Sequence, residues 1–106
     1  MTDLSVDIER DDSGEDFVCA KFSGDQWELN VKARPSEFSR LQGIRGFDWN
    51  SRAVAAVGRS AGASVFWSSD GEVATILVGQ DDETWDIAVS VPVTLVEDLV
   101  QTVADL

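Results

Sequence analysis

Apolar and polar residues alternate strictly along several stretches of this chain, and this alternation constrains the fold more than any other feature. Leu4, Val6 and Ile8 alternate with polar residues, and the same period of two recurs in residues 27–33 and 85–91. Such a period places apolar side chains on one face of a β-strand. Short turn sequences separate the stretches, and they lie at residues 11–14, 23–25 and 70–71. Loops this short connect antiparallel neighbours, so the pattern predicts β-hairpins.

Two segments change to a helical period, and each follows a proline. Pro35 is predicted to open a short helix that carries Phe38, Leu41 and Ile44 on one face and ends near residues 43–46. After Pro92, the sequence 94–97 (Thr-Leu-Val-Glu) matches a capping box, in which the first and last side chains satisfy free backbone N–H groups. An apolar stripe then predicts a buried helix face, formed by Leu95, Val96, Leu99, Val100, Val103 and Leu106.

These elements predict one α+β domain over residues 1–106. Its core is a single antiparallel sheet of about six strands with two helices, one short and one C-terminal, packed on one face. The segments 24–31 and 82–89, each followed by a proline and a helix, are similar. This similarity fits either two β-β-β-α units or two strand–helix junctions of the same kind. Residues 49–57 fit a short helix or an irregular strand, and residues 58–62 fit a turn.

The composition agrees with a folded domain in an ordinary aqueous compartment. Hydrophobic residues make up 43% and charged residues 26%, close to globular averages, which argues against disorder. No apolar run approaches the roughly 18 residues that span a bilayer. Residues 1–10 lack the apolar centre of a signal peptide. We therefore expect a cytoplasmic protein.

The chain lacks the residues that most enzymes use. It has no histidine, which is the commonest general base and transition-metal ligand, and its single cysteine excludes an internal disulfide. Cys19 lies in the apolar run 17–20, which predicts a buried thiol. Residues 58–62 match the G-x-S-x-G pattern of hydrolases, but that chemistry needs a nearby base and a following helix. We predict no catalytic residue, no cofactor and no metal, and hence no enzyme.

The charge is distributed in three blocks. Residues 1–30 hold nine acids against two bases, residues 31–69 hold six bases against two acids, and residues 70–106 hold nine acids and no base. A net charge of −12 opposes nucleic-acid binding. The excess fits a basic protein partner steered by the field, or solubility in a salt-rich cytoplasm.

The tryptophans give the second clue to function. Trp27 and Trp85 fall on the apolar faces of their strands and are predicted to lie in the core. Phe66 and Trp67 are adjacent on one strand, so they point to opposite faces, and one ring should lie on the side without helices. Trp49 is a second candidate for exposure. Exposed aromatic side chains often anchor protein interfaces.

The C-terminal part of the chain resembles the small acidic immunity proteins of bacterial polymorphic toxin systems. The resemblance covers mainly residues 63–106 and consists of Gly71-Glu72-Val73 opening a strand, Trp85 on the next strand, and a terminal Leu/Val helix. It implies an inhibitor that covers the active site of a toxin with acidic side chains.

Three hypotheses for function follow from these observations. The first is a non-enzymatic protein-binding module, an immunity or inhibitor protein that neutralises a basic toxin or enzyme. Its predicted partner contacts are Trp49, Trp67, Asp81, Asp82 and Glu83. The second is a structural or homo-oligomeric protein, a homodimer through the basic middle segment, whose acidity serves solubility or salt adaptation. The third is an enzyme with a carboxylate-bound metal at Asp81 and Asp82.

Overall fold

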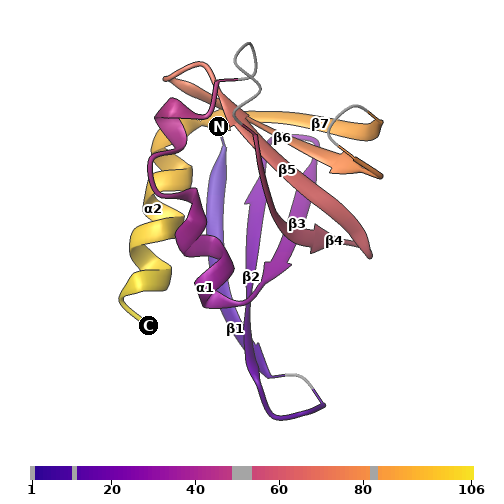
Figure 1. Cartoon of the computed structure of the whole chain (residues 1–106), viewed down its shortest axis with the longest axis vertical. Helices are drawn as coiled ribbons and strands as arrows, with labels where there is room; N and C mark the ends of the chain where they lie inside the picture. The colour runs from indigo at the N-terminus through magenta and orange to yellow at the C-terminus, as the bar shows by residue number, and fades with distance from the viewer. Residues whose placement is uncertain (1, 11, 49–53, 82–83) are drawn as a thin grey trace.

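The computed structural model describes residues 2–10, 12–48, 54–81 and 84–106, and these residues form one sheet covered by helices. The strands are β1 (Asp3–Arg10), β2 (Asp16–Ser23), β3 (Glu28–Ala33), β4 (Ala55–Ser60), β5 (Ala63–Ser69), β6 (Val73–Gly79) and β7 (Trp85–Pro92). The helical segments are α1 (Pro35–Phe38), the 3₁₀ turns η1 (Ser39–Leu41) and η2 (Ile44–Gly46), and α2 (Val93–Ala104). Every neighbouring pair of strands is antiparallel, and the strands follow sequence order across the sheet (Figure 1). The predicted α+β class with a single antiparallel sheet is confirmed.

The described sheet has seven strands, slightly more than the sequence predicts. The additional strand is β4, whose first half lies in the stretch for which the sequence left helix and strand open and whose second half, residues 58–60, lies in the predicted turn. Its apolar residues are mostly alanine, so its period is weak, and a register shift between Ala56 and Arg59 interrupts it further. The second half of the chain therefore has four strands before its helix, one more than a β-β-β-α unit.

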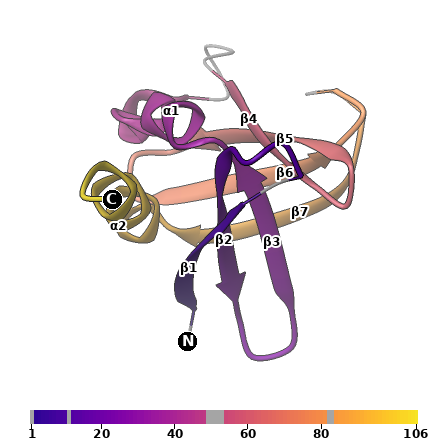
Figure 2. The same ribbon diagram turned by 90° about the horizontal axis from the view of Figure 1, so that it is seen from below.

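The core lies between the inner face of the sheet and the helical segments, which cover that face together (Figures 1 and 2). Phe38, Leu41 and Ile44 are buried, as their spacing predicts. From α2, the buried side chains are Val93, Val96, Leu99 and Val103. No helix in the described ranges is long and apolar enough to cross a membrane.

The predicted capping box at residues 94–97 is wrong. The helix begins at Val93, two residues before the start that the box implies, and no side chain caps it, while the Val93 N–H donates to the Glu72 carbonyl at 2.9 Å. The Glu97 carboxylate instead accepts two hydrogen bonds from Arg45, at 3.0 and 2.8 Å. Arg45 also donates to the Gly71 carbonyl at 2.9 Å. Glu97 therefore makes a tertiary contact in place of the predicted local cap. Through Arg45, this contact connects η2 with α2 and with the β5–β6 turn.

The Arg45–Glu97 pair predicts a pH dependence of stability. Hydrogen bonds from Arg45 lower the pKa of Glu97 from its ordinary value of 4.5. A carboxylate with a lowered pKa in the folded state stabilises it above the unfolded-state pKa, and this contribution is lost as the pH falls through the folded-state pKa. Glu97→Gln is therefore expected to lower the melting temperature at about pH 7, and this deficit should shrink as the pH falls below 4.5. Thermal unfolding of both proteins across this range tests the prediction, and a deficit that does not change with pH would contradict it.

The G-x-S-x-G sequence of residues 58–62 forms a β-hairpin, not a nucleophile elbow. Ser60 pairs with Ala63, and the two residues between them, Ala61 and Gly62, have φ of 51° and 83°. Positive φ at both central residues is typical of a type I′ turn, which matches the twist of paired strands. The pattern is therefore explained by turn geometry.

Ala61 is the one described non-glycine residue with positive φ, so its replacement should stabilise the fold. Asparagine tolerates this conformation better than alanine, and Asn-Gly is a preferred type I′ pair. Ala61→Asn is expected to raise the free energy of unfolding by about 0.5–1 kcal/mol. Ala61→Val, which adds a β-branch at the same position, should lower it. Urea unfolding measures both, and a lower midpoint for Ala61→Asn would refute the turn assignment.

Candidate protein-binding edge

Trp67 lies in the core, so its predicted role as a partner contact is wrong. Its side chain is fully buried, its indole Nε1 donates to the Val57 carbonyl at 2.9 Å, and its ring meets Phe22 edge-on at 5.9 Å. The helices cover the face of β5 that carries Trp67. The ring on the opposite face is Phe66, which is half-buried.

Trp85 is the converse case, because the sequence predicts it in the core and the structure exposes 43% of it. Alternation along β7 is present as predicted, but burial fades along the strand. Val91 is buried, Val89 is half-buried, and Ile87 is 48% exposed. The reason is that α2 starts where β7 ends and packs against α1, η1 and β1, so it covers only the last part of β7. Trp27, also predicted in the core, is half-buried.

β7 is also an edge strand. It pairs with β6 on one side, and no other described strand pairs with it on the other side (Figure 2). An edge strand presents unpaired backbone N–H and C=O groups, on which another chain can add a strand. We call Trp85, Asp86, Ile87 and the outward backbone of β7 the β7 edge surface.

The turn before β7 fixes the start of this surface. The Asp81 carboxylate accepts a hydrogen bond from the Thr84 N–H at 2.6 Å, and the Gln80 N–H donates to the Thr84 carbonyl at 2.9 Å. At Gly79 the register shifts, and a Cβ there would collide with the backbone of Thr84 and Trp85. The close approach therefore sets the position of Trp85. It also brings the exposed Asp81, one of the predicted contacts, to the same end of the strand.

Three of the five predicted contacts, Trp49, Asp82 and Glu83, lie outside the described residues. Of the remaining two, Asp81 is exposed and Trp67 is buried. Trp85 and Ile87 are the exposed side chains that the sequence reasoning missed. Their exposure could have been inferred from the place of β7 as the last strand of a meander. Such a strand has one neighbouring strand, and the helix that follows covers only its C-terminal end.

The other edge of the sheet, β1, differs from β7 in its charges. β1 also exposes an isoleucine, Ile8, by 53%. However, β1 carries four charged residues (Asp3, Asp7, Glu9 and Arg10), whereas β7 carries only Asp86. Charged side chains along an edge oppose the addition of another strand. β7 has little of this protection.

The thiol and the carboxylates of the described residues form no metal site. Cys19 is buried as predicted, and desolvation is the main cause that raises the pKa of its thiol above 9.0. Its Sγ lies 3.9 Å from the Asn30 Oδ1. Among the described residues, no three carboxylate or thiol side chains gather closely enough to hold a metal ion.

Comparisons with known proteins give no relative for this chain: no family model, curated protein or solved structure matches it.

Proposed function

We propose that this protein is a non-enzymatic binding module that captures a basic protein through the β7 edge surface. The observation that carries the proposal is the exposure of Trp85 and Ile87 on an edge strand with one charged residue. Tryptophan is enriched among the residues that dominate binding energy at interfaces. An open strand edge adds backbone hydrogen bonds to these side-chain contacts.

Charge complementarity selects a basic partner over a second copy of the chain. Residues 70–106, which include β6, β7 and α2, hold nine acids and no base. Pairing of two β7 strands would bring two such segments together, with Asp86 of one copy near the acids of the other. Like charges at an interface suppress association, whereas a basic surface is attracted and steered toward this edge.

The more specific form of the proposal is an immunity or inhibitor protein that neutralises a basic toxin or enzyme. Such a partner binds nucleic acid or another anion with a basic active site, and a strongly acidic protein is suited to cover it. The resemblance over residues 63–106 supports this form, because β7 and α2 lie within that segment.

Titration calorimetry with purified basic proteins encoded by adjacent genes tests the proposal. We expect tight binding that weakens as the salt concentration rises. Trp85→Ala is expected to cost about 2 kcal/mol or more, which corresponds to roughly a thirtyfold weaker affinity. The proposal would be contradicted if no adjacent gene encodes a basic protein, or if none of the basic proteins encoded there binds.

The opposite edge of the sheet provides matched controls. Ile87→Ala and Ile8→Ala remove the same side chain at 48% and 53% exposure. Asp86→Asn and Asp7→Asn remove the same charge from β7 and β1. Only the β7 variants should weaken binding, and Asp86→Asn should act mainly on the association rate. If sedimentation shows a dimer that the Ile87→Ala variant abolishes, the protein is homo-oligomeric through β7 rather than through the basic middle segment, and the proposal of a basic partner at β7 fails.

A further inference from the structure

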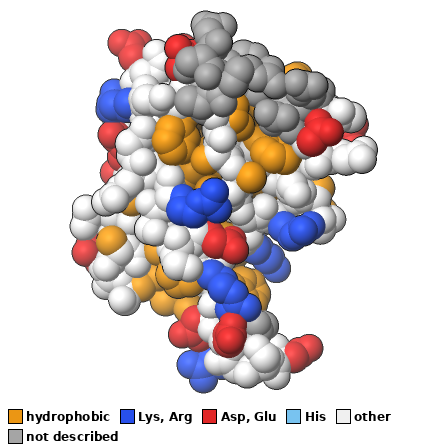
Figure 3. Space-filling model, in the orientation of Figure 1, with side chains coloured by type: hydrophobic (Ala, Val, Ile, Leu, Met, Phe, Trp, Pro, Cys, Tyr) orange, Lys and Arg blue, Asp and Glu red, His pale blue; other side chains and the backbone are white. Residues whose placement is uncertain are grey.

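A basic pocket lies away from the β7 edge surface, between α1 and the hairpin of β4 and β5. Its volume is about 530 Å³, within the range of small-molecule sites. Four of the eight basic residues of the chain line it: Lys32, Arg34, Arg40 and Arg59. One acidic residue, Glu37, lies among them. Figure 3 shows Lys and Arg side chains gathered across the middle of this face, in a chain that is otherwise strongly acidic.

The sheet itself brings two of these cations together. Lys32 of β3 and Arg59 of β4 are directly opposite, and they are the one registered pair between these strands in the described part of the chain. Like charges directly opposite each other destabilise a sheet. Glu9 offsets part of the charge of Lys32, since the Glu9 Oε2 lies 3.7 Å from the Lys32 Nζ.

Two of the four basic residues of the pocket are paired with acidic neighbours outside its lining. Glu15 is ion-paired with Arg34, and Glu9 with Lys32. Arg59 donates to the Gly62 carbonyl at 2.8 Å, a neutral partner. Arg40 makes no hydrogen bond or ion pair with its side chain to any described residue. Its charge is therefore available to a ligand.

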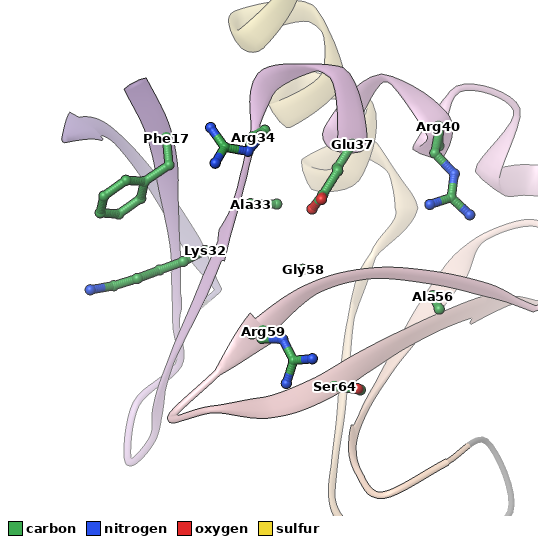
Figure 4. Close-up of a pocket in the computed structure, with 10 residues that line it drawn as sticks. All are labelled: Phe17, Lys32, Ala33, Arg34, Glu37, Arg40, Ala56, Gly58, Arg59 and Ser64. Carbon is green, nitrogen blue, oxygen red and sulfur yellow. The ribbon is translucent and has the colours of Figure 1, made fainter. Parts of the chain in front are cut away.

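The close-up shows how these side chains point. Arg40 points from the helical side toward the hairpin, and Arg59 extends along the hairpin toward Ser64 (Figure 4). Both residues line the pocket. Lys32 and Arg34 extend toward Phe17, on the other side of the pocket (Figure 4). The Glu37 side chain lies between Arg34 and Arg40 (Figure 4). Guanidinium groups on two opposite walls suit a tetrahedral oxyanion, which accepts hydrogen bonds from several directions, better than a planar carboxylate.

We propose that this pocket binds the phosphoryl group of a small molecule, held between Arg40 and Arg59 with the Ser64 hydroxyl as a further donor. The net charge of the chain does not prevent this, because salt screens charges beyond roughly 8 Å at physiological ionic strength. The apolar side chains of Phe17, Ala33 and Ala56 provide a surface for the rest of the ligand. The site is separate from the proposed protein-binding edge, and neither proposal depends on the other.

The proposal is tested by measuring the melting temperature of the intact protein with phosphate and with pyrophosphate. Sodium chloride at equal ionic strength is the baseline, and citrate is the carboxylate control. We expect both phosphates to raise the melting temperature above the chloride value, and more than citrate does. The amide NMR signals of Gly58, Arg59 and Ser64 should shift with the same titration curve. Arg40→Gln is expected to weaken binding roughly ten- to hundredfold, since it removes a charged hydrogen-bond donor.

Two variants separate the pocket from the general effect of charge. Arg10→Gln removes the same charge at a site outside the pocket, where Arg10 pairs with Asp16, and it should leave phosphate binding unchanged. Glu37→Gln removes the one carboxylate of the lining and should strengthen binding. The proposal is overturned by any of four results: no effect beyond chloride, equal effects of citrate and phosphate, equal losses in Arg10→Gln and Arg40→Gln, or weaker binding in Glu37→Gln.

Discussion

Replacing Trp67 by alanine is expected to destabilise the protein by about 3–5 kcal/mol, a large part of the stability of an ordinary small domain. Trp67 is the largest of the fully buried side chains, and it lies in the core with Phe22 and Val57. Its loss opens a cavity that a two-layer fold cannot close without moving β5 against the helices. It also removes the donor to the Val57 carbonyl and leaves that buried acceptor without its partner.

Trp85→Ala is the matched control, because it removes the same side chain from a position with 43% exposure. We expect Trp85→Ala to cost about 1 kcal/mol or less, since little buried contact is lost. Trp67→Phe should fall between the two, because it keeps most of the buried ring and loses the hydrogen bond. Urea denaturation at equilibrium measures all three variants. If Trp85→Ala costs as much as Trp67→Ala, the assignment of the buried and exposed tryptophans is wrong.

The second large effect is expected at Gly58, where β4 passes close to β3. Gly58 has φ of +81°, and an added Cβ would lie 2.8 Å from the Val31 Cγ1 and 2.9 Å from the Lys32 carbonyl oxygen. The left-handed conformation alone costs an alanine about 1–2 kcal/mol. Overlap with a backbone atom that is part of the sheet adds about 1–3 kcal/mol. Gly58→Ala is therefore expected to destabilise the protein by roughly 2–5 kcal/mol.

Gly14 separates the two causes. Its φ is +87°, nearly that of Gly58, but nothing lies within 4 Å of an added Cβ. Gly14→Ala should therefore show only the conformational cost, and the difference between the two variants gives the steric cost at the β3–β4 junction. Equal losses of stability would mean that β4 does not pass within contact distance of β3 at Gly58.

The sequence predicts the strands and the helix faces well, because both depend on local periodicity. The alternation in residues 29–33 and the spacing of Phe38, Leu41 and Ile44 each correspond to buried side chains in the structure. β4 is less predictable, since its alanines and its register shift weaken the period. The capping box fails for another reason: Glu97 finds a stronger partner in Arg45, which is distant in the sequence.

The candidate site was harder to predict than the fold. A period of two tells which side chains share a face, but it does not tell how far the covering helix extends along that face. The helix covers Val91 but does not reach Ile87, so Val91 is buried and Ile87 is exposed. The basic pocket was also hidden, because Lys32 and Arg59 are far apart in the sequence and become neighbours only through the pairing of β3 with β4.

Hydrogen exchange of the backbone amides shows whether a basic partner adds a strand to the β7 edge surface. Exchange is measured by mass spectrometry for the free protein and for its complex with the basic protein encoded beside it. Strand addition at β7 would protect the outward amides between Trp85 and Ser90, and it would leave β1, the other edge of the sheet, unchanged. Protection of β1 instead, or no change in β7 while the complex forms, would show that the partner does not bind at the β7 edge surface.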